Sequence, residues 1–356
     1  MASLTPLSAA EPLQRTPRRL PPWWSAALVG AVAYGVVPFV ASGYVFDALL
    51  IPFLALSLAA VGLNLLTGYA GQLSLGTAAF MAVGAYAAYN FNLRVSGLPL
   101  LVSIGLAGLT ATAVGVVFGL PSLRLRGFYL AVSTLAAQFF VQWALTKFSW
   151  FSNHNASGVI DAPPLQAFGI AFDTPVGRYL FALTVVSVLT LLVWRLVRTP
   201  TGHHFIAVRD HELAARVVGV PVLRTKLLAF AVSSFVIGVA GVLWGFVYLR
   251  TVEPAGFNLD RSFQILFIVI IGGLATLRGA FLGAALIVVF PLLLSRVGAS
   301  VFGSGFDSGV LEMSQRIVLG LLILFFLIVE PRGLAALGTR LLAWRPSRRG
   351  SGPPAA

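Results

Sequence analysis

Long apolar runs alternate with short polar segments along almost the whole chain. Each run holds roughly 15 to 24 residues, and about 20 apolar residues in a helix cross the hydrocarbon core of a bilayer. Glycines interrupt the pattern in 73–91 and in 262–296, so the boundaries are less sharply marked there. We predict an all-α fold, a polytopic transmembrane helical bundle of about ten spans: 25–43, 46–66, 73–91, 97–120, 127–146, 177–196, 227–249, 262–276, 280–296 and 313–330.

Composition supports a membrane protein and narrows its chemistry. Hydrophobic residues make up 58% of the chain and charged residues only 10%, whereas a soluble domain has about 25% charged residues. The net charge is +13, but no basic face carries interleaved aromatic rings, which argues against nucleic acid as a partner. The chain has no cysteine, so it forms neither a disulfide nor a thiolate metal site.

The distribution of basic residues predicts the orientation. Ten spans place both termini on one side of the membrane, and most of the 24 lysines and arginines fall on that side. The positive-inside rule makes this side the cytoplasm. We therefore expect a multi-pass protein of the plasma (cell inner) membrane with both termini cytoplasmic. Basic tails at 1–24 and 336–356 flank a transmembrane domain at 25–335, which contains a charged loop at 198–226.

The first apolar run, 25–43, also resembles a signal peptide in length, with Ala41-Ser42-Gly43 as a possible cleavage site. Because more spans follow it, we expect a retained signal anchor instead.

The membrane-spanning runs lack the groups that ion-coupled carriers use. The second to fifth spans hold no charged residue or histidine well inside the apolar region, where proton- or sodium-coupled carriers usually place them. The four histidines lie in loops: His154, His203, His204 and His211. The chain also has no phosphate loop of the Gly-x-x-x-x-Gly-Lys-Ser/Thr type. An energy source outside this polypeptide is therefore expected.

A glycine-rich segment with neutral polar side chains follows the second span. Its glycines break or tightly pack a helix, and its amides and hydroxyls offer hydrogen bonds without a fixed charge. On the pattern alone, close helix packing with hydroxyls bonded to their own backbone is the simpler interpretation. The alternative is a path for a polar solute, lined by Asn64, Gly68, Tyr69, Gly71, Gln72, Ser74 and Thr77.

This segment carries a resemblance to a known family. Gly62–Ala88, GLNLLTGYAGQLSLGTAAFMAVGAYAA, is similar to the signature of the LivM family, the permease subunits of branched-chain amino acid ABC importers. Three later segments resemble that family in the same order, over roughly 45–335: Leu123–Leu135, Ser157–Pro164 and Ile271–Ala284. Thr77 stands where the family often has histidine, and Asn153–Ala156 where a Thr-Gly-Gly run is common, so the substrate stays open.

The loop at 147–176 is polar and mostly uncharged. Its simplest interpretation is a connector with turn chemistry. The functional alternative is contact with a solute-binding protein, or a gate at the outer mouth, through Asn155, Ser157 and Gly158. We expect no metal site, because His154 has no second ligand near it in the sequence.

The charged loop at 198–226 predicts one helix over Phe205–Val218 that lies at the membrane surface. Gly219 suits a left-handed helix cap, and Pro221 cannot continue the helix. The pattern around Glu212 resembles the coupling helix of ABC importer permeases, which fits into a cleft on the ATPase subunit. This resemblance implies coupling residues Arg209, Glu212, Ala214, Ala215 and Gly219. An amphipathic helix bound to anionic headgroups is the alternative.

The resemblance implies a permease subunit that forms the path for branched-chain amino acids and is not itself an enzyme. ATP and magnesium would bind the partner ATPase, and this chain would hold no cofactor. Other implied partners are a LivH-like second permease or a second copy, an extracytoplasmic solute-binding protein and membrane lipid. The alternatives are a same-family permease for urea or short amides, a self-sufficient channel or carrier, and an integral-membrane enzyme, for which His203-His204 is the only hint.

Overall fold

The computed structural model describes residues 22–302, except 96, 123–127, 156–158, 164 and 168–169, and short pieces at 313, 317–318, 320–321, 324–325, 328 and 333–335. More than half of the predicted tenth span, most of the predicted tail 1–24 and all of the predicted tail 336–356 therefore lie outside the described residues. The chain divides into two compact units, Met1–Ser42 and Gly43–Ala356. In the first unit, α1 (Pro22–Gly35) and α2 (Val37–Val40) replace the continuous helix predicted for 25–43.

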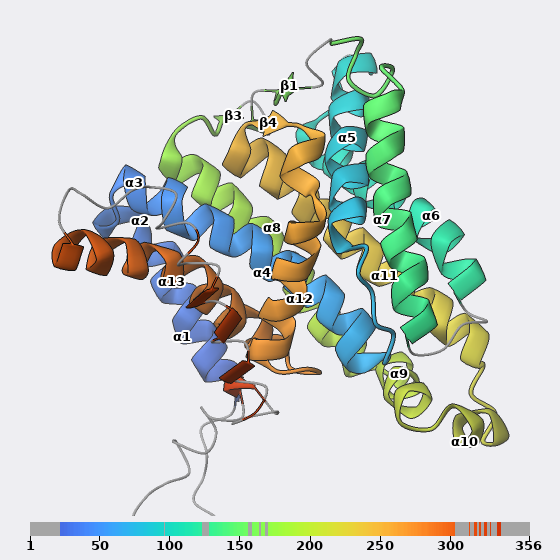
Figure 1. The fold of residues 1–356 in the computed structure, drawn as a ribbon. Coiled ribbons are helices and arrows are strands. Elements are labelled where there is room, and N and C mark those ends of the chain that lie inside the picture. The colour runs from blue at the N-terminus through green and yellow to red at the C-terminus, as the bar shows by residue number, and fades with distance from the viewer. Residues whose placement is uncertain are drawn as a thin grey trace, which may run out of the picture. The chain divides into compact units, whose positions relative to one another are not determined.

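The second unit is almost entirely helical, as predicted (Figure 1). Its helical elements are α3 (Gly43–Val45), η1 (Phe46–Leu50), α4 (Ile51–Asn64), η2 (Leu65–Tyr69), α5 (Thr77–Arg94), α6 (Leu100–Ser122), α7 (Phe128–Lys147), α8 (Pro175–Val197), α9 (Pro200–Asp210), α10 (Glu212–Val217), α11 (Val222–Val242), η3 (Leu243–Leu249), η4 (Pro254–Phe257), α12 (Leu259–Gly272) and α13 (Leu277–Phe302). Segments η1, η2 and η3 are π-helical and η4 is a 3-10 helix.

Short strands join parts of the loops. Strand β1 (Ile160–Asp161) pairs antiparallel with β4 (Thr251–Val252), with Ile160 opposite Val252. Strands β2 (Gln166–Ala167) and β3 (Ile170–Ala171) form a small hairpin. The predicted connector at 147–176 thus contains more order than turn chemistry alone implies.

Six helices in the described part of the chain are long and apolar enough to cross a membrane: Gly43–Tyr69, Leu100–Leu120, Pro175–Val197, Val222–Leu249, Pro254–Gly272 and Leu277–Arg296. Helices α5 and α7 match two further predicted spans but carry more polar side chains, such as Asn90 and Gln138. The structure supports a helical membrane protein, but it does not confirm the count of about ten spans.

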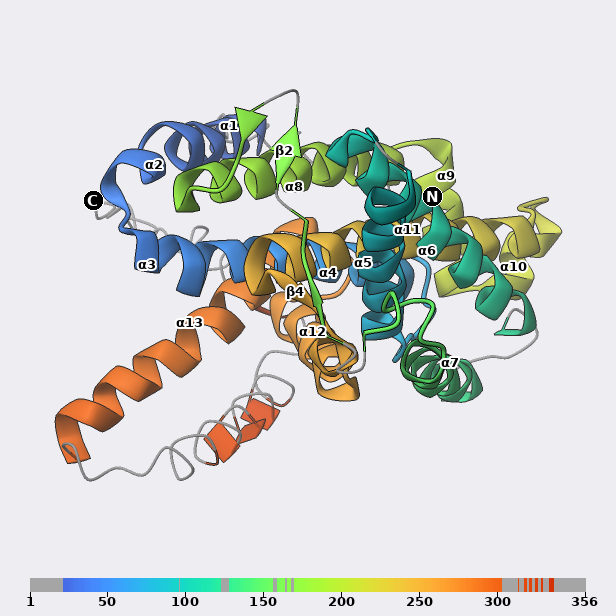
Figure 2. The same cartoon turned by 90° about the horizontal axis from the view of Figure 1, so that it is seen from above.

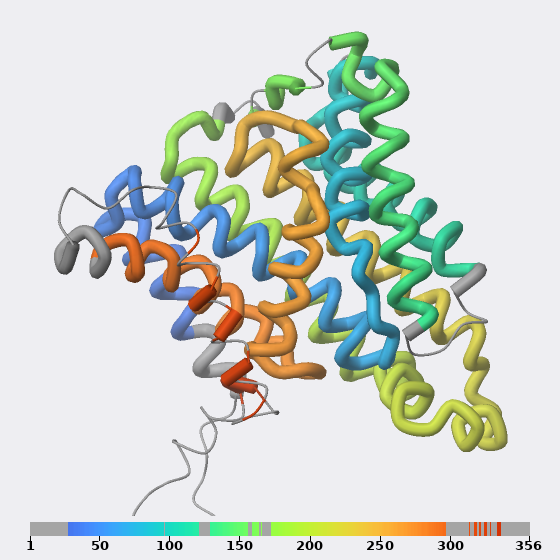
Figure 3. Tube along the Cα trace, viewed as in Figure 1, coloured from blue at the N-terminus to red at the C-terminus, as the bar shows by residue number. Residues whose placement is uncertain are grey.

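Two long helices end in the same way, and each is followed by a stretch that is not α-helical. The helix Gly43–Tyr69 ends in η2, and an irregular stretch, residues 70–76, leads to α5; we call this stretch the first break. The helix Val222–Leu249 ends in η3, and residues 250–258, the second break, lead to α12. The predicted span 73–91 is therefore wrong at its start, because the connection between η2 and α5 is not helical (Figure 3) and α5 begins only at Thr77.

Helix α4 lies at the centre of this unit, between α8 and α13 in Figure 2. Almost all of its residues are buried. Helices α5 and α11 approach closely at glycines, because a Cβ on Gly84 would collide with the backbone of Gly238, and one on Gly241 with that of Met81. Small residues let helix backbones pack tightly in a membrane, and these glycines allow it here.

Loops that the predicted spans place on one side of the membrane do lie together. At one end, Arg209 donates to the Gly68 carbonyl, and the Asn64 amide donates to the Thr276 carbonyl, both at 2.8 Å. At the opposite end, Arg94 donates to the Trp150 carbonyl, and the Ala162 N–H to the Arg250 carbonyl, both at 2.9 Å. The contacts support the predicted order of crossings over these loops.

Candidate functional site

The first break enters the middle of the helical unit. The Leu75 N–H donates to Thr134 Oγ1 at 2.9 Å, and the Ala79 N–H donates to Gln138 Oε1 at 2.7 Å. Gln138 lies near the middle of α7, so α5 begins about halfway along its neighbour rather than at a membrane surface. The first turn of α5 is buried.

Both broken helices meet at Gln138. Its Nε2 donates to the Phe257 carbonyl at 2.9 Å, and Ser262 Oγ donates to its Oε1 at 3.1 Å. Ser262 Oγ also accepts from the Ala78 N–H at 2.8 Å. We name Ala79, Gln138, Phe257 and Ser262 the Gln138 junction. It brings the starts of α5 and α12 to one level inside the bundle.

Sequence reasoning missed the Gln138 junction. Its signal was present, since Thr134, Gln138 and Gln142 are polar at four-residue spacing inside an otherwise apolar run. Such spacing places all three on one face of a helix. A polar stripe on a predicted span marks contact with other polar groups, because an unpaired amide inside a membrane is costly.

Three predicted path residues lie on the first break and at its end. Gln72, Ser74 and Thr77 are buried, with exposed fractions of 3%, 2% and 0%. Both amide atoms of Gln72, and the Thr77 hydroxyl, have no hydrogen-bond partner among the described residues. A buried polar group without a partner costs about 1–3 kcal/mol. Gln72 and Thr77 therefore hold unused hydrogen-bonding groups inside the protein.

Asn64 and Gly68 hold a turn. Asn64 Oδ1 accepts from the Ala275 N–H, and Nδ2 donates to the Thr276 carbonyl, both at 2.8 Å. This pairing supports Ala275 in its left-handed conformation, with φ of 58°. A Cβ on Gly68 would collide with Ala275, so glycine permits the close approach. The amide of Asn64 is thus already occupied by the turn at Ala275 and Thr276, between α12 and α13.

The predicted surface helix over Phe205–Val218 is wrong in its bounds. It is two helices, α9 and α10, separated at His211, whose backbone is extended with φ of −151° and ψ of 94°. The bend lets Val208, Ala215 and Val222 form one buried cluster. In a straight helix, Val208 and Ala215 would be about 10 Å apart along the axis.

The predicted end of that segment is confirmed. Gly219 has φ of 92°, and the Val220 N–H donates to the Ala215 carbonyl at 2.9 Å. This is the left-handed cap that glycine favours after a helix.

Helix α10 presents an apolar surface. Leu213, Val217 and Val218 are 67%, 88% and 83% exposed. Exposed apolar side chains that lie together mark an interaction surface. Glu212 forms ion pairs with Lys226 of α11 and with Arg216 of its own helix. Lys226 Nζ lies 2.9 Å and Arg216 Nη2 3.4 Å from its carboxylate oxygens.

Apart from Glu212, the predicted coupling residues divide into three groups. Ala214 and Gly219 are exposed beside the apolar surface of α10. Ala215 is 5% exposed and belongs to the buried cluster. Arg209 turns toward the membrane helices, where its Nη1 lies 2.8 Å from the Gly68 carbonyl oxygen.

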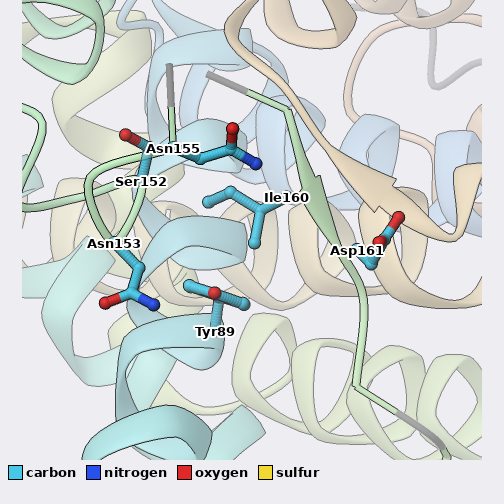
Figure 4. A pocket seen from close by; sticks show the side chains of 6 residues that line it. All are labelled: Tyr89, Ser152, Asn153, Asn155, Ile160 and Asp161. Carbon is cyan, nitrogen blue, oxygen red and sulfur yellow. The ribbon is translucent and has the colours of Figure 1, made fainter. Parts of the chain in front are cut away.

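At the opposite end, a cavity of about 390 Å³ opens beside the loop after α7. Figure 4 shows its lining: Tyr89, Ser152, Asn153, Asn155, Ile160 and Asp161. The predicted contact residue Asn155 lies here, and its Nδ2 donates to the Val159 carbonyl at 2.6 Å. The other two predicted contact residues, Ser157 and Gly158, lie outside the described residues. The lining offers two amides, two hydroxyls and one carboxylate.

A buried arginine contacts the end of the second broken helix. Arg178, in the first turn of α8, is 3% exposed. Its Nη2 lies 3.0 Å from Asp47 Oδ1, and its Nη1 donates to the Val247 carbonyl at 3.5 Å. Sequence reasoning did not single out this residue, because a lone arginine at the end of a span usually reaches the membrane surface.

Comparisons with known proteins agree with the geometry. The family described as "Branched-chain amino acid transport system / permease component" matches residues 45–327. The high-affinity branched-chain amino acid transport system permease protein LivM of Escherichia coli (strain K12) is 33% identical over 291 residues, which are 74% of this chain and 66% of that protein. The chain thus spans slightly less than two thirds of that relative.

Two further relatives show the breadth of the similarity. The probable branched-chain amino acid transport permease protein LivM of Methanocaldococcus jannaschii is 24% identical over 312 residues, covering 77% of this chain and 88% of that protein. The autoinducer 2 import system permease protein LsrC of Enterobacter sp. (strain 638) is 28% identical over 169 residues, covering 46% and 48%. No solved structure matches. The broken helices, the buried polar groups and these matches lead to one conclusion: this chain belongs to the family of branched-chain amino acid transport system permease components.

Proposed function

We propose that the chain forms the translocation path of an ABC importer for branched-chain amino acids in the plasma (cell inner) membrane. The observation that carries the proposal is the 33% identity to LivM over 74% of the chain. ATP and magnesium bind a partner ATPase, and this chain contributes no catalytic residue. A LivH-like second permease or a second copy completes the path, and an extracytoplasmic solute-binding protein delivers the solute.

The first break supports a path for a small polar solute. Gln72 and Thr77 offer buried amide and hydroxyl groups without a partner among the described residues, and Ser74 lies between them. Broken helices inside a membrane are tolerated where they are buried in protein or line a cavity, and transporters place substrate sites beside them. Neutral groups suit a zwitterion, whose own charges interact with helix ends.

Helix α10 supports a docking role toward the ATPase. Its exposed Leu213, Val217 and Val218 form an apolar surface outside the candidate spans. Headgroup binding would favour a basic polar face, whereas α10 carries Glu212 as well as Arg216. A protein partner therefore fits this surface better than a lipid surface.

A second candidate is a permease for another small polar solute. The similarity to LsrC, an autoinducer 2 import permease, supports this alternative, as does Thr77 at a position where the LivM family often has histidine. Urea and short amides would also suit the neutral groups of the first break.

Reconstitution in proteoliposomes tests the proposal. The chain is purified with the ATPase, permease and solute-binding subunits of its own organism, and the complex is inserted into the vesicles. It should import radiolabelled L-leucine only when ATP is present on the side of the membrane where the ATPase subunit lies. Urea, acetamide and autoinducer 2 serve as competing solutes. The chain alone should not accumulate leucine against a gradient; if it does, it is a self-sufficient carrier and the proposal is wrong.

Two substitutions separate the path from the docking surface. Ser74→Trp should block uptake while the ATPase subunit still co-purifies, because the bulky ring fills the first break. Val217→Glu should abolish co-purification, since it places a charge on the apolar surface of α10. Leu93→Glu, at an exposed leucine of the opposite end, is the matched control and should leave ATPase association unchanged.

A further inference from the structure

Arg209 joins the surface helices to the first broken helix. Its Nη1 donates to the Gly68 carbonyl at 2.8 Å, across 141 residues of sequence. Its Nε and Nη2 both lie 2.8 Å from Asp210 Oδ1. The neighbouring carboxylate thus fixes the plane of the guanidinium group, and the remaining nitrogen points at η2.

The Gly68 carbonyl is available because the helix ends there. The Ala70 N–H donates to Leu65 and the Gln72 N–H to Leu66, at 3.1 and 3.0 Å. The chain then turns away at Gly71, whose φ is 67°. The last carbonyls of a helix need partners from outside it, and Arg209 provides one for Gly68.

Gly71 lets the arginine lie against the first break. A Cβ on Gly71 would lie 2.6 Å from Arg209 Cγ, so any larger residue would displace the arginine stem. The next residue along the chain is Gln72, the first of the three buried polar residues on the path. The contact therefore falls directly at the start of the candidate path.

Arg209 also belongs to one body with α10. It follows Val208, which packs with Ala215 of α10 and Val222 of α11 in a single buried cluster. Lys226, on α11, holds Glu212 at 2.9 Å. A displacement of α10 by a docked partner is thus passed to Arg209 through packed side chains and an ion pair. On the far side of η2, Asn64 connects the same region to Ala275 and Thr276.

We propose that Arg209 is the positioning residue that transmits displacement of α9 and α10 to the first break, and so sets Gln72, Ser74 and Thr77 in step with the partner ATPase. The link is mechanical and persists through the transport cycle. This inference rests on the proposed function, because it assigns an internal route to the movement that docking would produce.

The first test compares Arg209→Ala with Arg224→Ala in the complete transporter. Arg224 is an exposed arginine in the first turn of α11, on the same end of the molecule. Arg209→Ala should keep ATPase association and ATP hydrolysis but lower leucine uptake per ATP by roughly tenfold, which lies within the usual range for coupling between sites. Arg224→Ala should leave this ratio unchanged. Normal uptake per ATP in Arg209→Ala overturns the proposal.

The second test replaces the link by a covalent bond. The chain has no cysteine, so an engineered pair has no competitor. A Cβ at residue 71 would lie 3.1 Å from the Cβ of Arg209, which is shorter than the separation of about 3.5–4.5 Å found in disulfides, so the two backbones must move apart slightly for the bond to form. The double variant Gly71→Cys/Arg209→Cys should be uncoupled when reduced and regain leucine uptake when oxidised. Gly71→Cys alone controls for strain at a positive φ.

The outcomes separate this inference from the proposed function. If the unaltered transporter does not import leucine with ATP, the proposed function fails. If it imports leucine but the oxidised double variant stays uncoupled, only the mechanical link fails. If Arg209→Ala loses its ATPase subunit, Arg209 is a docking residue and the link is wrong.

Discussion

The two broken helices, Gly43–Tyr69 and Val222–Leu249, end in the same kind of structure. Each long helix ends in a π-helical segment, η2 or η3, and each is followed by a left-handed residue, Gly71 or Arg250. In each, an arginine from elsewhere donates to a carbonyl of that segment: Arg209 to Gly68 and Arg178 to Val247.

The arginines differ in how freely they can move. The Arg178 side chain is 4% exposed and forms an ion pair with Asp47, which lies far from it in sequence. The Arg209 side chain is 32% exposed and pairs with its neighbour Asp210. Arg178 sits on a candidate membrane span, whereas Arg209 sits on a surface helix. We infer that the contact of Arg178 with η3 is fixed, whereas the contact of Arg209 with η2 can move.

The largest effect is expected when the contact between Arg178 and η3 is removed. Arg178→Ala should lower the free energy of unfolding by about 2–3 kcal/mol, because it removes a buried side chain and leaves the Val247 carbonyl and Asp47, whose side chain is 45% exposed, without their partner. Thermal unfolding in detergent, followed by tryptophan fluorescence, measures the loss. Arg209→Ala, its counterpart, should lower this stability by only about 1 kcal/mol, because its ion pair with Asp210 is half exposed and, among the described residues, the Gly68 carbonyl is the only buried group that loses a partner. Equal losses in the two variants would remove the distinction between the two contacts.

The next effect concerns the place where the two broken helices meet. Gln138→Leu should destabilise the protein by about 2 kcal/mol, because it strands the Ala79 N–H and the Phe257 carbonyl in the interior. Hydrogen exchange should rise together at 75–80 and at 257–262. Gln142→Leu, one turn further along α7, is the matched control and should leave both segments protected. A rise in only one segment would show that the two starts are not coupled through Gln138.

A smaller effect is expected at Gly71, the left-handed residue of the first break. Gly71→Ala should cost about 1–2 kcal/mol, from the positive φ alone, and should reduce uptake further because its Cβ meets the Arg209 stem. A thermal melt and a leucine uptake assay on the same preparation measure both effects. Uptake that stays normal despite the lost stability would argue against contact between the first break and Arg209 as a functional feature.

The smallest effect is at the second break. Arg250→Gly should change the stability by less than about 1 kcal/mol, because relief of the left-handed strain offsets the greater freedom of the unfolded chain. The same melt, with Gly71→Ala beside it, provides the measurement. A large loss would mean that the Arg250 side chain, and not only its backbone, holds β4 against β1.

Much of this architecture could be predicted from the order of residues. Apolar runs marked where most helices lie, and Gly219 marked the end of α10. These features are local, because helix length and helix ends depend on nearby residue types. The LivM-like segments between Gly62 and Ala284 indicated the family for the same reason.

Only the tertiary structure decided which polar groups meet. Asn64 was predicted on the path, yet it holds Ala275 and Thr276, over two hundred residues away. Gln138 was not predicted at all, yet it joins the starts of α5 and α12. Arg209 was expected to face a partner, but it reaches Gly68. Periodicity shows the face of a helix on which a side chain lies, and a hydrogen bond inside a membrane depends on which distant segment packs against that face.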